Sequence, residues 1–129
     1  MVEAERPSPG PRRAGRREVV CVIDLRRVYD GRADLQILDV REPYEWAAGR
    51  IEGAIHIPLA RLMAGGDRGV LDQSKPVVVV CRTGNRSELA ATMLQARGYD
   101  ASNLEGGMEA WAREGLPFSA ADGGPGRVA

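Results

Sequence analysis

Residues 76–87 read PVVVVCRTGNRS, and this stretch decides the fold class. Four consecutive valines after Pro76 form the near-continuous apolar run that a strand needs when both faces of its sheet are covered. The polar residues that follow predict a short loop, and apolar residues at helical spacing begin directly after it. A buried strand, a loop and a helix in this order are typical of an α/β fold built on a parallel sheet.

The same alternation of apolar runs and helical patterns extends in both directions along the chain. We expect strands at residues 19–23, 35–40, 54–57 and 77–80, and a weaker fifth at residues 101–104. We expect a short helix from Pro43, a longer helix over residues 86–97 with Gly98 as its carboxyl-terminal cap, and a last helix over residues 108–114. Three glycines within residues 63–69 predict a surface loop.

Composition at the two ends sets the expected domain boundaries. Residues 1–17 hold five Arg against two Glu and almost no large apolar side chains, so they cannot offset the entropy of ordering. We expect residues 1–18 to be a disordered basic arm, with an anion-binding or targeting arm as the alternative. Residues 119–129 are mostly small, with Pro and Gly, and predict a flexible tail. A single domain over residues 19–118 accounts for the rest.

Charge, hydropathy and cysteine spacing exclude several classes of function. The 18 basic and 18 acidic residues cancel, and the folded part offers no basic field for nucleic acid. No run of eighteen apolar residues exists and only a short one follows the arginine pairs, so we expect no membrane span and no signal peptide. Cys21 and Cys81 stand in no metal-binding spacing. We therefore expect a cytoplasmic protein with reduced thiols and no metal.

The loop over residues 81–87 holds the side chains suited to chemistry. Cys81 ends the valine strand, and ligands of parallel sheets bind beyond the carboxyl ends of strands, where a loop entering a helix turns several free N–H groups toward one point. These groups, with Arg82 and Arg86, favour a thiolate over a thiol. Gly84 permits the backbone turn. The other polar residues are suited to bonding the loop or capping the helix, and they are Thr83, Asn85 and Ser87.

Each charged or reactive residue of the loop has a structural alternative. The alternative for Cys81 is an inert core residue, which its polar neighbours argue against. Arg86 suits two roles equally, binding an anion or bracing the loop through an ion pair with Asp39 or Glu42. Arg82 is expected to project toward the mouth of the site.

Other residues that could carry chemistry are expected to be structural. His56, the single histidine, alternates with strand residues and precedes a proline. Cys21 lies within a predicted strand and is expected in the core. The aromatic residues of the predicted helices are expected to pack on apolar faces, and they are Tyr44, Trp46 and Trp111.

Four motifs resemble the rhodanese family in order and spacing. They are LDVRE at residues 38–42, GAIHIP at 53–58, CRTGNRS at 81–87 and NLEGGMEAW at 103–111. The likeness spans residues 19–117, and the chain is similar to a single-domain rhodanese. It departs from many relatives in having Arg50 after Gly49 where they have His, and in its amino-terminal arm.

The resemblance implies a fold, a reaction and a set of site residues. It implies a five-stranded parallel sheet flanked by helices on both faces, and the chemistry expected of the Cys81 thiolate needs no cofactor. It also implies transfer of sulfane sulfur from thiosulfate or a persulfide donor to cyanide or a thiol, through a persulfide on Cys81. Residues 82–87 would bind the substrate, and Asp39 and Arg41 would lie at the base of the loop.

Three other functions compete with this one. A phosphatase or arsenate reductase has five residues between its Cys and Arg, whereas four separate Cys81 from Arg86. A non-catalytic interaction module usually lacks the cysteine. A protein-to-protein sulfur carrier would use the same cysteine with a partner protein as donor and another as acceptor, and this alternative stays open.

Overall fold

Strands and helices alternate along residues 22–129, the part of the chain that this computed structural model describes. The strands are β1 (Val22–Ile23), β2 (Gln36–Asp39), β3 (Ile55–His56), β4 (Val77–Val80) and β5 (Ala101–Leu104). The helices are α1 (Leu25–Asp30), α2 (Pro43–Ala48), α3 (Leu59–Met63), α4 (Asn85–Ala96) and α5 (Gly107–Arg113), with a 3-10 turn over Arg32–Asp34. The predicted arm over residues 1–18, and Cys21, lie outside this part.

The five strands form one parallel sheet in the order β1-β5-β4-β2-β3. β4 lies at the centre, with Val80 in register with Asp39 of β2 and Val77 in register with Ala101 of β5. All four valines of β4 are buried, as their run in the sequence predicts. The five-stranded parallel sheet implied by the resemblance is confirmed.

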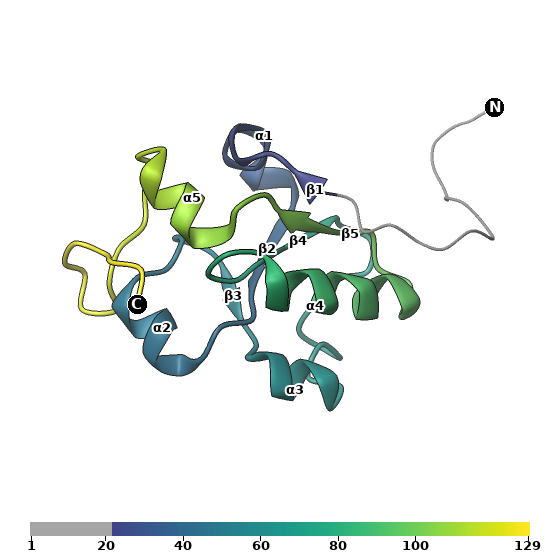
Figure 1. The fold of residues 1–129 in the computed structure, drawn as a ribbon. Coiled ribbons are helices and arrows are strands. Elements are labelled where there is room, and N and C mark those ends of the chain that lie inside the picture. Colours follow the sequence, from purple (N-terminus) through teal and green to yellow (C-terminus); the bar gives the residue numbers. More distant parts are fainter. Residues whose placement is uncertain (1–21) are drawn as a thin grey trace.

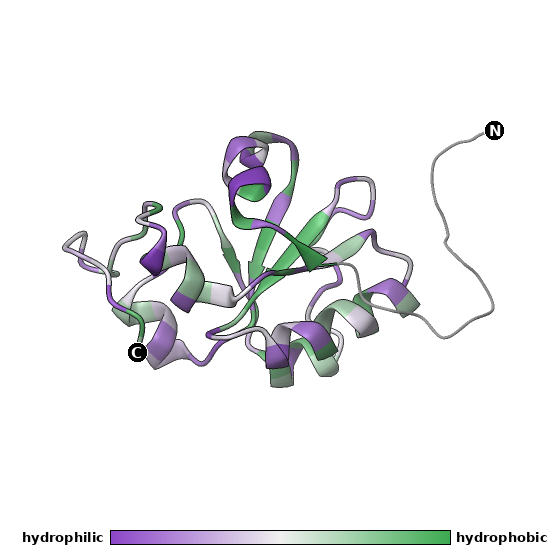
Figure 2. Ribbon diagram, turned by 45° about the horizontal axis from the view of Figure 1, so that its top comes forward, coloured by the Kyte–Doolittle hydropathy of each residue, from purple (hydrophilic) through white to green (hydrophobic). Residues whose placement is uncertain are grey.

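Helices cover both faces of the sheet (Figure 1). Val77 and Val79 belong to an apolar cluster with residues of α3 and α4, while Val78 and Val80 belong to a second cluster with residues of α1 and α5. Much of the hydrophobic colouring of the ribbon lies in the strands of the sheet (Figure 2). Cys81 continues the alternation and lies in the first cluster, on the face that α4 covers.

Two short helices, α1 and α3, were not predicted from the sequence. Asp24 begins α1 by accepting a hydrogen bond from the Arg27 N–H at 3.1 Å. Val28 is the buried residue of α1, and Leu62 is the buried residue of α3. A helix with one buried side chain shows no apolar period, so its pattern does not stand out. None of the described helices is long and apolar enough to cross a membrane.

The loop predicted over residues 63–69 is tied to the core by a buried carboxylate. Asp67 accepts hydrogen bonds from the guanidinium of Arg97 at 2.6 Å and from the Tyr99 hydroxyl at 3.0 Å. Burial, followed by the bond to Asp67, raises the pKa of Tyr99. The loop is therefore anchored to the carboxyl end of α4, whereas Cys81 lies near the amino end of this helix.

Residues 119–129, predicted to be a flexible tail, contact α2 and the residues that follow it. Ser119 forms an antiparallel bridge with Arg50, and the Arg127 N–H donates to the Ala48 carbonyl at 2.9 Å. Val128 packs against the apolar cluster of α1 and α5. The flexibility of this segment stays a prediction.

Candidate active site

The loop over residues 81–87 connects the carboxyl end of β4 to α4 and wraps around the Cys81 sulfur. Gly84 has a φ of 118°, a conformation that side chains resist, so its predicted role in the turn is confirmed. This conformation directs the Gly84 N–H to within 3.1 Å of the Cys81 Sγ. Cys81 itself is only 1% exposed. Burial alone would fit an inert core cysteine. The atoms around Sγ therefore decide between an inert and a reactive Cys81.

Those surroundings are hydrogen-bond donors. The Ser87 N–H lies 3.4 Å from Sγ and the Ser87 hydroxyl lies 3.3 Å away. Burial raises the pKa of the Cys81 thiol, but bonds from Ser87, Gly84 and Thr83 outweigh it, and the pKa lies below its ordinary value. The loop thus stabilises a negative charge on a sulfur atom that is shielded from water.

Asn103, which was not among the predicted site residues, supports this loop from the neighbouring strand. Its Nδ2 donates to the Gly84 carbonyl at 3.2 Å, and its Oδ1 accepts from the Ser87 hydroxyl at 2.5 Å. A hydroxyl has one proton, so Ser87 donates to Sγ or to Asn103 at any moment, not to both. The available signal was a polar side chain within a buried strand, β5, next to the strand that ends in Cys81.

Arg86 is bound to Glu45, not to Asp39 or Glu42 as the bracing alternative proposed. Its two terminal nitrogens lie 2.8 and 2.9 Å from the two carboxylate oxygens of Glu45, which is 3% exposed. The hydrogen bond from Arg86 lowers the pKa of Glu45 against the opposing effect of burial. The same bond raises the pKa of Arg86. Glu45 also accepts from the Glu42 N–H at 2.9 Å, so the pair joins α2 to the loop.

Arg82 is half-exposed at the surface of the loop and forms an ion pair with Glu109 of α5. The Arg82 Nε lies 3.0 Å from the Glu109 carboxylate, and the two side chains are 51% and 40% exposed. The backbone fixes the same contact, because the Glu109 N–H donates to the Arg82 carbonyl at 3.0 Å. The Met108 N–H likewise donates to the Cys81 carbonyl at 2.8 Å, so the first turn of α5 is fastened to the loop.

Asp39 and Arg41 form a buried ion pair at the carboxyl end of β2. The guanidinium of Arg41 contacts Asp39 at 2.8 to 3.1 Å and donates to the Gly49 carbonyl at 2.6 Å. The pair bonds the end of β2 to the end of α2. This contact fits a structural role for Asp39 and Arg41 near the base of the loop.

The remaining predicted residues lie at the surface or serve packing. Thr83 and Asn85 are exposed and no side chain caps the start of α4, so of the two roles predicted for these polar residues only bonding of the loop is seen, at the Ser87 hydroxyl. His56 stacks on Trp46 at 4.6 Å and bonds the Arg41 carbonyl. Tyr44 is 66% exposed, so the prediction that it packs on an apolar face is wrong. Within residues 22–129, no three His, Cys, Asp or Glu side chains are grouped so as to hold a metal ion.

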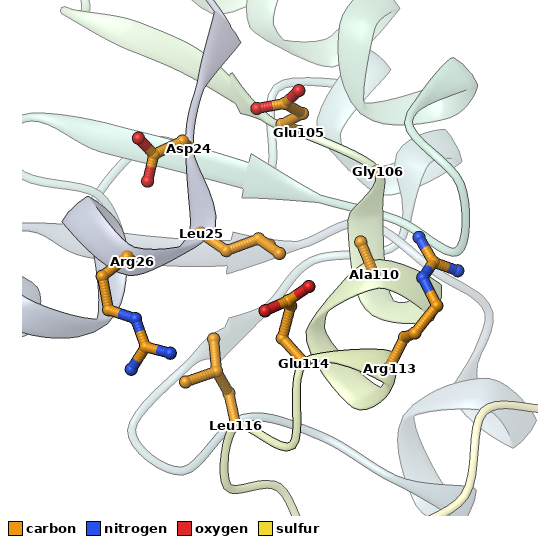
Figure 3. A pocket seen from close by; sticks show the side chains of 9 residues that line it. All are labelled: Asp24, Leu25, Arg26, Glu105, Gly106, Ala110, Arg113, Glu114 and Leu116. Atoms are coloured by element: carbon orange, nitrogen blue, oxygen red, sulfur yellow. The ribbon is translucent and has the colours of Figure 1, made fainter.

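A separate pocket lies between the start of α1 and α5 (Figure 3). Charged side chains of both signs line it, including those of Arg113, the last residue of α5, and Glu114, which follows it. Cys81 is not among its lining residues, which are Asp24, Leu25, Arg26, Glu105, Gly106, Ala110, Arg113, Glu114 and Leu116. The Cys81 thiol is therefore not part of this pocket.

Known proteins resemble this chain over nearly all of its described part. The rhodanese-like domain family matches residues 22–114. A sulfurtransferase of Allochromatium vinosum is 37% identical over 91 residues, which cover 70% of this chain and 83% of that protein. A crystal structure of a rhodanese-related protein from Thermoplasma volcanium matches with a TM-score of 0.72 at 33% identity, covering 77% of this chain and 97% of that one.

A longer relative contains a similar segment. The probable adenylyltransferase/sulfurtransferase MoeZ of Mycobacterium tuberculosis is 37% identical over 95 residues, which cover 73% of this chain. The match covers only 24% of MoeZ, so this chain corresponds to about a quarter of that protein.

Proposed function

This chain belongs to the rhodanese-like domain family, and we propose that it transfers sulfane sulfur through a persulfide on Cys81. Relatives that are 37% identical are named sulfurtransferases, which supports sulfur transfer as the general reaction. The proposed donor is thiosulfate or a small persulfide, and the proposed acceptor is cyanide or a thiol. Residues 82–87 are the proposed binding loop, supported by Asp39 and Arg41.

The donors around Cys81 Sγ are the observation that supports this proposal most. Gly84 and Ser87 direct N–H and O–H groups at a buried sulfur and lower the pKa of the thiol. A thiolate is the reactive form of cysteine toward sulfur, so a lowered pKa raises the reactive fraction at neutral pH. An inert core cysteine has no need of these donors.

The reaction is a double displacement with balanced charge. The Cys81 thiolate attacks the outer sulfur of thiosulfate, the sulfur–sulfur bond of the donor breaks, and its electron pair leaves with sulfite. A new bond joins Sγ to the transferred sulfur, which now holds the negative charge. Cyanide or a thiolate then attacks this outer sulfur, and the electron pair of the broken bond returns to Sγ. The loop N–H groups stabilise the anionic sulfur in both halves of the cycle.

Two alternatives differ in what the structure offers them. A phosphatase needs an arginine free to hold phosphoryl oxygens, whereas Arg86 is bound to Glu45 through both terminal nitrogens. A protein-to-protein sulfur carrier is favoured by the similarity to MoeZ, whose name includes a sulfurtransferase beside a second activity. The carrier would use the same Cys81 persulfide, with thiosulfate as a slow donor.

The test is the intact mass of the purified protein before thiosulfate, after thiosulfate and after cyanide. We expect the gain of one sulfur atom and its loss to cyanide with formation of thiocyanate. The Cys81→Ser variant should gain no sulfur. The Cys21→Ser variant, which removes the other cysteine of the chain, should behave as the parent protein does.

The outcomes separate the candidate functions. Sulfur gained from a persulfide donor but not from thiosulfate would favour the carrier. Sulfur gained by Cys81→Ser and not by Cys21→Ser would show that Cys21 carries the sulfur, and the proposal would be wrong. Hydrolysis of a phosphate ester that depends on Cys81, without any sulfur gain, would support a phosphatase instead.

A further inference from the structure

We propose that Glu109 sets the donor specificity of this site by neutralising Arg82, so that the preferred donor is a persulfide with at most one negative charge. The inference rests on the proposed sulfur transfer and names the donor class for it. Glu109 lies on α5, outside the loop that holds Cys81, and reaches that loop through its ion pair with Arg82 at 3.0 Å.

Within residues 22–129, both arginines of the loop and the buried Arg41 are matched by carboxylates. Arg82 pairs with Glu109, Arg86 pairs with Glu45, and the third pair is Arg41 with Asp39. Arg82 and Arg86, which the sequence suggested for anion binding, are therefore both paired with carboxylates of the protein itself. What remains around Sγ is a set of neutral N–H and O–H donors, which suits one negative charge on sulfur.

This charge balance discriminates between donor classes. Thiosulfate brings two negative charges toward a thiolate, and the two arginines of the described loop are already paired with carboxylates, which weakens their ability to offset this repulsion. A hydropersulfide, RSSH, brings none when its terminal sulfur is protonated. The Cys81 thiolate attacks that terminal sulfur, the donor's sulfur–sulfur bond breaks, and RS⁻ leaves while Cys81 becomes the hydropersulfide. Atoms and charge balance without a further reactant.

Of the three acidic partners, Glu109 is the one that can be substituted with the least effect on the fold. Asp39 and Glu45 are buried, and both also bond backbone N–H groups, so their loss would disturb the fold. Glu109 is 40% exposed, and its backbone N–H holds the Arg82 carbonyl whatever its side chain is. Glu109→Gln therefore frees the Arg82 charge and leaves α5 in place.

The experiment compares two donors on four proteins, following the rate of sulfur gain on Cys81 by intact mass. The donors are thiosulfate and the persulfide of 2-mercaptoethanol, which has no charge beyond that of its sulfur. The proteins are the parent, Glu109→Gln, Arg82→Gln and the double variant. Glu114→Gln is the matched control, because Glu114 directly follows α5 and lines the separate pocket (Figure 3).

We expect the parent to have a higher kcat/KM for the mercaptoethanol persulfide than for thiosulfate. Glu109→Gln should lower the KM for thiosulfate about fivefold, which corresponds to the upper range of an exposed ion pair, with kcat unchanged. The gain should shrink at high salt, because screening weakens the freed charge. Arg82→Gln alone should raise the KM for thiosulfate about fivefold, because it leaves the Glu109 charge unpaired, and the double variant, which has neither charge, should stay within about twofold of the parent.

Two results would overturn the role of Glu109. One is an unchanged KM for thiosulfate in Glu109→Gln. The other is a KM for thiosulfate in the double variant about tenfold above that of the parent, because Arg82 would then bind the donor despite its partner. Failure of the underlying function looks different, since no variant would then gain sulfur on Cys81 from either donor.

Discussion

Two opposing effects act on the Cys81 thiol, burial against hydrogen-bond donors, and Ser87 supplies two of those donors. Ser87→Ala removes the hydroxyl and keeps the N–H. We expect the pKa of Cys81 to rise by about one unit, since a hydrogen bond to a charged group contributes on the order of 1.5 kcal/mol. The rate of iodoacetamide alkylation against pH, measured in a Cys21→Ser background, gives this pKa directly.

Thr92→Ala is the control for this measurement. Thr92 is also an α4 residue, and its hydroxyl donates to the Glu88 carbonyl at 3.0 Å, away from Sγ. It should leave the alkylation profile where it was. An unchanged profile in Ser87→Ala would mean that the Ser87 proton stays on Asn103, and that the N–H groups alone lower the pKa of Cys81.

Glu45 links the stability of the fold to pH. Its pKa is lowered from an ordinary value of 4.5, first by the hydrogen bond from Arg86. The stabilisation is therefore complete above pH 4.5 and is lost as the pH falls through the lower, folded-state pKa. Glu45→Gln should lower the free energy of unfolding at pH 7 by about 2 kcal/mol, because it breaks a largely buried pair.

Urea denaturation at pH 7 and pH 3 tests this dependence on Glu45. The difference between Glu45→Gln and the parent should be large at pH 7 and should shrink at pH 3, where the parent begins to lose the same charge. Glu52→Gln, which alters an exposed carboxylate, should differ little from the parent at either pH. A difference of equal size at both pH values would show that the charge of Glu45 is not what stabilises the fold.

At the scale of elements, the contact between α5 and the loop depends on Gly107. A Cβ at this position would lie 2.5 Å from the Cys81 carbonyl oxygen and 2.6 Å from that of Arg82, at a φ of 62°. Gly107→Ala should lower the free energy of unfolding by about 3 kcal/mol, combining backbone strain with displacement of the loop. It should also slow sulfur gain on Cys81.

Gly115→Ala is the control that separates backbone strain from steric contact with the loop. Gly115 has a similar φ of 75°, but nothing lies within 4 Å of a Cβ placed there. Thermal denaturation should show a smaller loss for Gly115→Ala, and its rate of sulfur gain should match the parent. Equal effects of the two substitutions would mean that backbone strain alone accounts for Gly107.

The same elements show how far the sequence predicts this fold. The strand β4 and the helix α4 could be predicted closely, because a run of valines and a repeated apolar spacing are local patterns. The partners of the arginines could not be predicted, because Glu45 and Glu109 lie 41 and 27 residues from Arg86 and Arg82 along the chain. Which carboxylate meets which guanidinium depends on how α2 and α5 dock, and residue spacing does not encode that.

At the scale of the whole molecule, residues 119–129 extend the fold beyond the part that matches the family, which ends at residue 114. They bond α2 at Ala47 and Ala48 and place Val128 against the core. Because α2 also contains Glu45, the tail and the Cys81 loop contact the same short helix, although no bond joins the tail to the loop among the contacts of residues 22–129.

Deletion of residues 120–129 should therefore lower stability more than activity. We expect the free energy of unfolding to fall by about 1.5 kcal/mol, the low end for burying a valine side chain, and the rate of sulfur gain on Cys81 to change less than twofold. Deletion of residues 1–18, which composition predicts to be disordered, should change neither quantity. Urea denaturation and the intact-mass assay measure both on each protein. A tail deletion as stable as the parent would show that these contacts contribute nothing, and that the segment behaves as the flexible tail its composition predicts.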